Sequence, residues 1–131
     1  MIAEKLSVCV VTDRLQESPD FYVKHYGAEV TFDCGWYVHL RIGKKTSELQ
    51  LMERRESGPP ACNPAGLMLN VQVADVDAEH ARLTGAGLAP IMPIADHPWG
   101  DRGFALLDPS GITLYVYSNR KPAAEFEKYF K

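Results

Sequence analysis

The sequence is poor in cysteine and contains no long hydrophobic run. Its three cysteines, Cys9, Cys34 and Cys62, are odd in number and far apart, so they form neither a disulfide framework nor a zinc-ligand pattern. We expect reduced thiols, with Cys9 in the core because it lies in an apolar run. The longest apolar runs are far shorter than the roughly 20 residues that span a bilayer, and the N-terminus predicts no secretory leader. The sequence therefore predicts a cytoplasmic protein without a membrane segment.

The net charge is small, and the common catalytic signatures are absent. The formal net charge is −3, which disfavours nucleic acid as a partner and slightly favours cationic ligands. The chain has no G-x-S-x-G, no H-E-x-x-H and no Walker-type glycine loop. Its 131 residues have an average globular composition, so a single domain spanning residues 1–131 is expected.

The first half of the chain predicts a strand, a helix and three more strands. A β-branched run at residues 5–11 predicts the first strand. Ser18 is the expected N-cap of the helix, with Pro19 at its first position and Gly27 at its end. The three following strands are expected at residues 28–33, 36–42 and 47–52, separated by hairpin-sized gaps. Residues 4–53 thus form one βαβββ module, and the polar segment 54–65 is its linker to the next.

The second half repeats this order. A strand at residues 66–73 is followed by a turn and N-cap at Asp75 and by a helix that stops at Gly85 and Gly87. The remaining strands are expected at residues 88–94, 102–107 and 112–118. Residues 66–119 form the second βαβββ module, and a short amphipathic helix is expected within residues 121–131. The fold class is therefore α+β.

Four short motifs, in order, resemble those of one superfamily. They are Asp13 followed by SPDFY at residues 18–22, VADVDA at 73–78, PWGDRGF at 98–104 and FALLDPSG at 104–111. Together they resemble the glyoxalase, bleomycin resistance protein and extradiol dioxygenase superfamily, also called the vicinal oxygen chelate (VOC) superfamily. The P-W-G element is typical of its bleomycin-resistance-like branch. The resemblance implies a curved mixed sheet around a cleft, and a homodimer.

In the metal-using members of this superfamily, the first and fourth strands of each module supply four metal ligands. The matching positions here are Leu6, Gln50, Met68 and Tyr115. Leucine and methionine cannot chelate a hard divalent ion, and Tyr115 stands where a glutamate is expected. The resemblance thus implies neither metal nor cofactor, and it disfavours metal-dependent glyoxalase or dioxygenase activity.

Strand alternation places aliphatic residues on one face of each sheet and polar or aromatic residues on the other. The expected pocket, mostly apolar with a few polar groups, is lined by Leu6, His39, Glu48, Gln50, Met52, Met68, Trp99, Phe104 and Tyr115. A loop expected at residues 96–103 would form one wall of this pocket, and its Trp99, together with Phe104, would stack on a ligand. Glu48 and Gln50 would meet its polar or cationic part. Trp36 is expected on the helix-covered face instead.

Three functions remain open. The first is metal-independent binding or sequestration of a small aromatic or cationic compound, as in the antibiotic-resistance branch. The second is an isomerase or lyase that uses His39 and Glu48 as an acid–base pair. The third is a non-catalytic module that regulates a partner, which a fold without a pocket would favour. The alternative to a pocket is that these residues simply fill the interior of the sheet.

Overall fold

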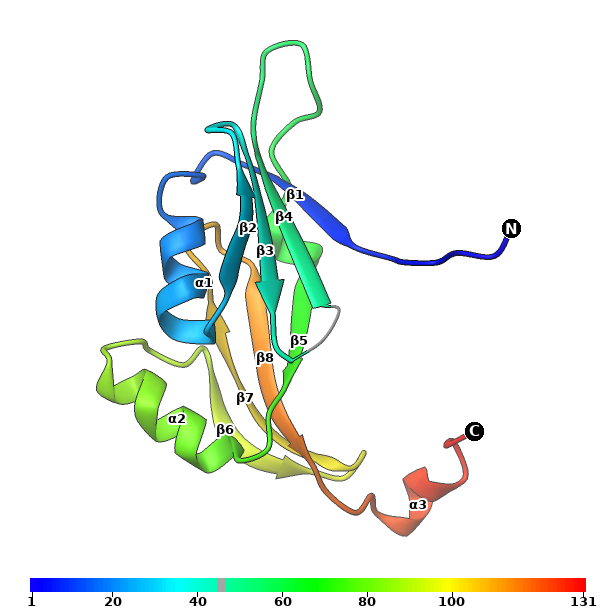
Figure 1. The fold of residues 1–131 in the computed structure, drawn as a ribbon. Coiled ribbons are helices and arrows are strands. Elements are labelled where there is room, and N and C mark those ends of the chain that lie inside the picture. Colours follow the sequence, from blue (N-terminus) through cyan, green and yellow to red (C-terminus); the bar gives the residue numbers. More distant parts are fainter. Residues whose placement is uncertain (45–46) are drawn as a thin grey trace. The chain divides into compact units, whose positions relative to one another are not determined.

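Each half of the chain forms one four-stranded sheet in the computed structural model, which describes residues 1–44 and 47–131 (Figure 1). The first unit, residues 1–63, contains β1 (Val8–Thr12), α1 (Ser18–Tyr26), β2 (Glu29–Asp33), β3 (Tyr37–Ile42) and β4 (Ser47–Glu53). The second unit, residues 64–131, contains the short 3-10 helix η1 (Pro64–Gly66), β5 (Met68–Gln72), α2 (Val76–Gly85), β6 (Met92–His97), β7 (Asp101–Leu107), β8 (Thr113–Asn119) and α3 (Ala124–Glu127). The predicted α+β fold with two βαβββ modules and a short C-terminal helix is confirmed.

Both sheets have the same mixed topology. The strand order is β1-β4-β3-β2 in the first sheet and β5-β8-β7-β6 in the second. The first strand of each module runs parallel to the fourth, whereas the other neighbours are antiparallel. A parallel pair needs a long crossover, and the module's helix and its two intervening strands supply it.

In the first unit the aliphatic residues of β3 and β4 form the core. Val38 pairs with Leu51 and Leu40 with Leu49, and all four are buried together with Tyr22 of α1, which packs against β2 and β3. The expectation for Cys9 was wrong, because its side chain is exposed: Cys9 alternates with the buried Val10 along β1. The other face of this sheet therefore carries the polar residues of β3 and β4.

Two further details of the first unit differ from the sequence prediction. Glu17, not Ser18, is the N-cap of α1, and the Ser18 hydroxyl donates to the carbonyl oxygen of Arg14 at 2.9 Å. Trp36 precedes β3 rather than lying within it and is 40% exposed, so it does not belong to the helix-covered core. Its ring lies 3.8 Å below the guanidinium carbon of Arg55.

In the second unit α2 packs against β7 and β8. Asp75 caps the helix as expected, since its side chain accepts from the backbone N–H of Ala78 at 3.0 Å. The buried Ser118 hydroxyl joins β8 to the start of α2: it accepts from Val76 N–H at 3.0 Å and donates to the Val73 carbonyl at 2.8 Å. Helix and sheet are thus tied at one point by polar contacts as well as by apolar packing.

Two elements of the second unit begin or end away from their predicted positions. The strand expected at residues 88–94 is β6, Met92–His97, and α3 comprises four residues. β6 is an edge strand with a register shift between Met92 and Ala95, where Pro93 is accommodated. Among the described residues, no helix combines the length and the apolar character needed to cross a bilayer.

Candidate functional site

The second sheet carries a pocket of about 480 Å³ on the face opposite α2. It is lined by Met68, Asn70, Met92, Trp99, Asp101, Tyr115 and Tyr117. The face follows from strand register, because Asn70 of β5 pairs with Tyr115 of β8, and Tyr117 pairs with Gly103 of β7. The alternate residues Leu114 and Val116 are fully buried on the helix side. One strand, β8, thus supplies the core to one face and aromatic rings to the other.

Gly103 provides the space in which the Tyr115 ring lies. A Cβ atom at residue 103 would come within 2.6 Å of Tyr115 Cζ and hydroxyl oxygen, and within 3.0 Å of the Val116 carbonyl oxygen. No side chain larger than hydrogen fits there without displacing the phenol. Tyr115 then stacks on Tyr117 at a ring separation of 5.8 Å and an interplanar angle of 18°.

Trp99 is presented by a tight turn. The expected loop at residues 96–103 is instead a hairpin in which Pro98, Trp99 and Gly100 connect β6 to β7. Gly100 has φ 113°, a conformation that favours glycine. The turn is held to the C-terminal segment by two backbone hydrogen bonds of 2.8 Å, from Ala123 N–H to Pro98 and from Arg120 N–H to Gly100. Trp99 is 46% exposed, so part of its surface stays open to a ligand.

Asp101 is the centre of a hydrogen-bond network in this pocket. Trp99 Nε1 donates to Asp101 Oδ2 at 2.9 Å, and the Tyr115 hydroxyl donates to Oδ1 at 2.9 Å. His97 Nδ1 lies 2.8 Å from the same Oδ1, and its ring stacks on Trp99 at 4.4 Å. Burial and, after it, the hydrogen bond to the Asp101 carboxylate raise the pKa of Tyr115. Tyr115 is therefore a neutral hydrogen-bond donor at physiological pH.

Four of the expected pocket residues share the corresponding face of the first sheet. Register pairs His39 with Gln50, and Met52 and Glu48 flank Gln50 on the same side of β4. The Gln50 amide donates to His39 Nε2, and Glu48 Oε2 lies 3.4 Å from that nitrogen. His39 Nε2 thus lies between the Gln50 amide and the Glu48 carboxylate.

Glu48 already has a cationic partner. Its carboxylate forms an ion pair with Lys5, and the hydrogen bond from Lys5 lowers the pKa of Glu48 more than burial raises it. Arg41 and His39 add favourable charge. Glu48 is thus held ionised on the first sheet by its ion pair with Lys5.

The positions that hold metal in related proteins do not suit a metal here. Leu6 precedes β1, is 88% exposed and has no donor atom, whereas Met68 offers only a thioether. Gln50 is engaged by His39, and Tyr115 is a protonated phenol bonded to Asp101. Within residues 1–44 and 47–131, no three His, Cys, Asp or Glu side chains gather as metal ligands.

The structure sorts the expected ligand-binding residues into three groups. Trp99, Tyr115 and Met68 line the pocket of the second sheet, and His39, Glu48, Gln50 and Met52 lie on the first sheet. Phe104 belongs to neither group, which corrects its assignment to the pocket: it is fully buried on the α2 side, with its ring 4.9 Å from that of His80. Alternation along β7 places Phe104 on the same face as Arg102 and Leu106 but does not say which face of the sheet that is.

Several pocket residues were missed in the sequence. They are Asn70, Met92 and Asp101, whereas alternation along β8 places Tyr117 on the same face as Tyr115. A signal was present for Asp101, because a three-residue turn at Pro98-Trp99-Gly100 places it opposite His97, its register partner. The others lie at alternate positions of strands whose inward face was not determined by the sequence.

Comparison with known proteins gives consistent matches over most of the chain. Residues 6–116 match the family model described as the Glyoxalase/Bleomycin resistance protein/Dioxygenase superfamily. The uncharacterized protein Mb0911c of Mycobacterium bovis is 31% identical over 117 residues, covering 81% of this chain and 77% of that protein.

Solved structures show the same fold at lower identity. A glyoxalase/bleomycin resistance protein/dioxygenase from Nocardioides has a TM-score of 0.74 at 22% identity, over 92% of this chain and 87% of that one. A lactoylglutathione lyase from Agrobacterium tumefaciens has a TM-score of 0.71 at 19% identity, over 88% and 94%. At these identities the likeness concerns the fold alone.

Proposed function

Because the chain belongs to the glyoxalase, bleomycin resistance protein and dioxygenase superfamily, we propose that it binds a small aromatic compound without a metal, in the pocket of its second sheet. The observation that carries this proposal is the pocket lining. Three aromatic rings, Trp99, Tyr115 and Tyr117, face one space of about 480 Å³, a volume typical of small-molecule sites.

The rest of the lining suits a flat ligand. Met68 and Met92 are flexible and polarisable, and they adapt to the edge of a ring system. The Trp99 indole is fixed by its hydrogen bond to Asp101 and by stacking on His97, so little side-chain entropy is lost when a ligand stacks on its free surface. Rigid aromatic rings together with adaptable methionines favour planar compounds.

The residues at the family's metal positions support a metal-independent mode of binding. Tyr115 uses its hydroxyl within the Asp101 network, and Leu6 and Met68 bring no oxygen or nitrogen. Affinity in this proposal therefore comes from stacking and burial of apolar surface, not from coordination.

The test uses acridine, a neutral planar probe, and isothermal titration calorimetry. Trp99→Ala removes the stacking surface and is expected to weaken acridine binding by about 1–3 kcal/mol. Trp36→Ala is the matched control, since Trp36 is similarly exposed but lies beside Arg55 in the first unit. Equal affinity in the wild type and in Trp99→Ala would contradict this site, and so would an equal loss in the Trp36→Ala control.

A second candidate function rests on the first sheet. The 3.4 Å separation of His39 Nε2 and Glu48 Oε2 is compatible with an acid–base pair of an isomerase or lyase, once a substrate displaces the Gln50 amide from His39. Turnover that is lost in both His39→Asn and Glu48→Gln, but kept in Trp99→Ala, would favour this candidate over the binding protein.

A further inference from the structure

We infer that Asp101 is a charged subsite of the second-sheet pocket, and that the natural ligand carries a cationic group on or beside its aromatic ring. This inference rests on the proposed function and narrows it, because it names the chemical class of the ligand. It assigns the electrostatic role to Asp101, a residue outside the family's metal-ligand positions.

Asp101 presents a fixed negative charge to the pocket. It is 8% exposed yet belongs to the pocket lining, and both carboxylate oxygens are held by donors. Two of these donors, the Trp99 indole and the Tyr115 hydroxyl, are neutral groups. They position the carboxylate and stabilise its charge without neutralising it.

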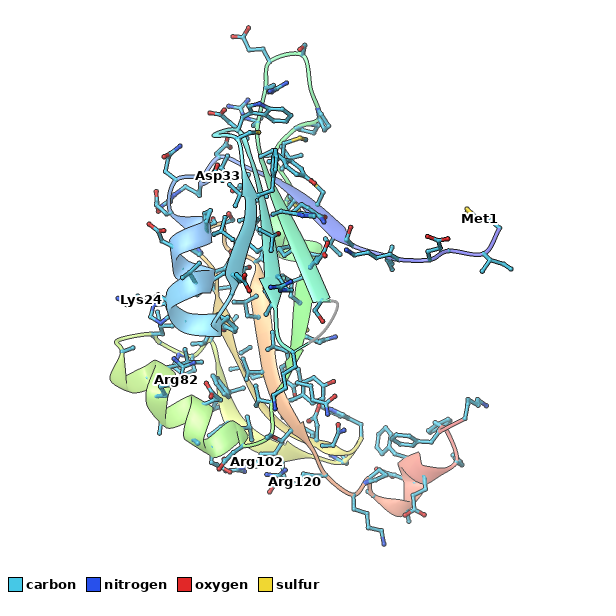
Figure 2. All side chains as sticks on the ribbon, viewed as in Figure 1. Met1, Lys24, Asp33, Arg82, Arg102 and Arg120 are labelled. Atoms are coloured by element: carbon cyan, nitrogen blue, oxygen red, sulfur yellow. The ribbon has the colours of Figure 1, made fainter. Side chains whose placement is uncertain are left out.

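No arginine or lysine among the described residues forms an ion pair with Asp101; within that part of the chain its only such contact is with His97. The neighbouring Arg102 points to the other face of the sheet, where Figure 2 shows it on the α2 side. There it binds Asp77 at 2.9 Å and approaches Asp96 at 3.5 Å. The charge of Asp101 is therefore left for a ligand to meet.

The aromatic lining strengthens this preference. A cation next to Asp101 would also contact the faces of Trp99 and Tyr117, whose π electrons attract positive charge. An ion pair between a cationic ligand and Asp101 would be screened less in this partly buried pocket than in water. An anionic ligand would be repelled by the same carboxylate. The sequence indicated Glu48 as the group that meets the cationic part of a ligand, but Glu48 is paired with Lys5.

The experiment compares two probes of nearly equal shape, the permanent cation N-methylacridinium and neutral acridine, in mildly alkaline buffer. The wild-type protein is expected to bind the cation about tenfold more tightly. Asp101→Asn should remove this preference, so that the ratio of the two affinities approaches one. The ratio of affinities is the readout because a general disruption of the pocket would lower the affinity for both probes to the same extent.

Two controls separate charge from structure. Tyr115→Phe removes one hydrogen bond to Asp101 but keeps the carboxylate, so the preference for the cation should persist even if both affinities fall. Asp96→Asn removes an equal charge from the same hairpin, on a side chain that is 71% exposed, and should also keep the preference. A ratio that falls as far in either control as in Asp101→Asn would overturn the inference.

Protein that keeps Asp101 can also decide the question if Asp101→Asn does not fold. In Trp36→Phe protein Trp99 is the only tryptophan, so quenching by the cation reports binding beside Asp101. Acridine binding equal to that of the cation would refute the charged subsite and leave the proposed function standing. Failure of both probes to bind would refute the proposed function, and this inference with it.

Discussion

At the scale of single residues, Gly103 makes room for an aromatic side chain of the pocket. Its missing side chain leaves the space for the Tyr115 ring, which in turn reaches Asp101. The sequence contains no sign of this role, because a glycine within a strand is equally compatible with a bulge or a bend. The contact becomes visible only when Tyr117, its register partner, and Tyr115 are placed across the sheet from it.

Gly103→Ala should displace the Tyr115 phenol from Asp101. The pKa of Tyr115, now raised by burial and by the carboxylate, is expected to fall toward the ordinary tyrosine value, which an ultraviolet absorbance titration measures. Overpacking should also lower the free energy of unfolding by about 1–3 kcal/mol. Gly85→Ala is the control, since nothing lies within 4 Å of its added Cβ. An unchanged tyrosine titration in Gly103→Ala would contradict the role assigned to this glycine.

A local motif indicated the position of Trp99 but not that of Phe104 or Asp101, and the role of Trp99 in ligand binding stays a prediction. Trp99 lines the pocket because proline and glycine flank it in a turn, as its motif indicated. Phe104 was placed on the wrong face because alternation defines two faces of a strand but not which one a helix covers. Asp101 was overlooked because its importance lies in its contacts with Trp99 and Tyr115, not in a recognisable spacing.

At the level of elements, the order of strands and helices could be predicted almost completely. Turn glycines and period-two alternation marked β3, β4, β7 and β8 to within a residue at each end. The larger error was at β6, where Pro90 and Pro93 break the local pattern, and pairing with β7 decides where the strand begins. Propensity along one segment does not contain that cross-strand information.

The junction of α2 and β8 provides a test of how an element is anchored. Ser118→Ala removes a buried hydroxyl that bonds both Val76 N–H and the Val73 carbonyl, so two backbone groups lose their partner. The free energy of unfolding should fall by about 1–3 kcal/mol, as measured by urea denaturation. Ser57→Ala, at an exposed position in the segment after β4, should change stability by less than about 0.5 kcal/mol. A similar loss in both variants would argue against this anchor.

For the whole molecule, metal content is an expectation that can be tested directly. We expect purified protein to contain no stoichiometric zinc, nickel, manganese or iron, because Leu6, Met68 and Tyr115 do not suit such an ion. Elemental analysis without prior chelator treatment measures this. One metal per chain, with ligand binding lost on chelation, would overturn the expectation. The homodimer inferred from the family resemblance stays a prediction.

The pairing of first with last strand has a consequence for how the protein is made. β1 leaves the ribosome well before β4, its partner, and β5 well before β8, so neither sheet can close until its module is nearly complete. The first module can finish its sheet while the second is still being translated. While β5, β6 and β7 have emerged and β8 has not, the strands β5 and β7 lack their partner and expose edges that favour aggregation.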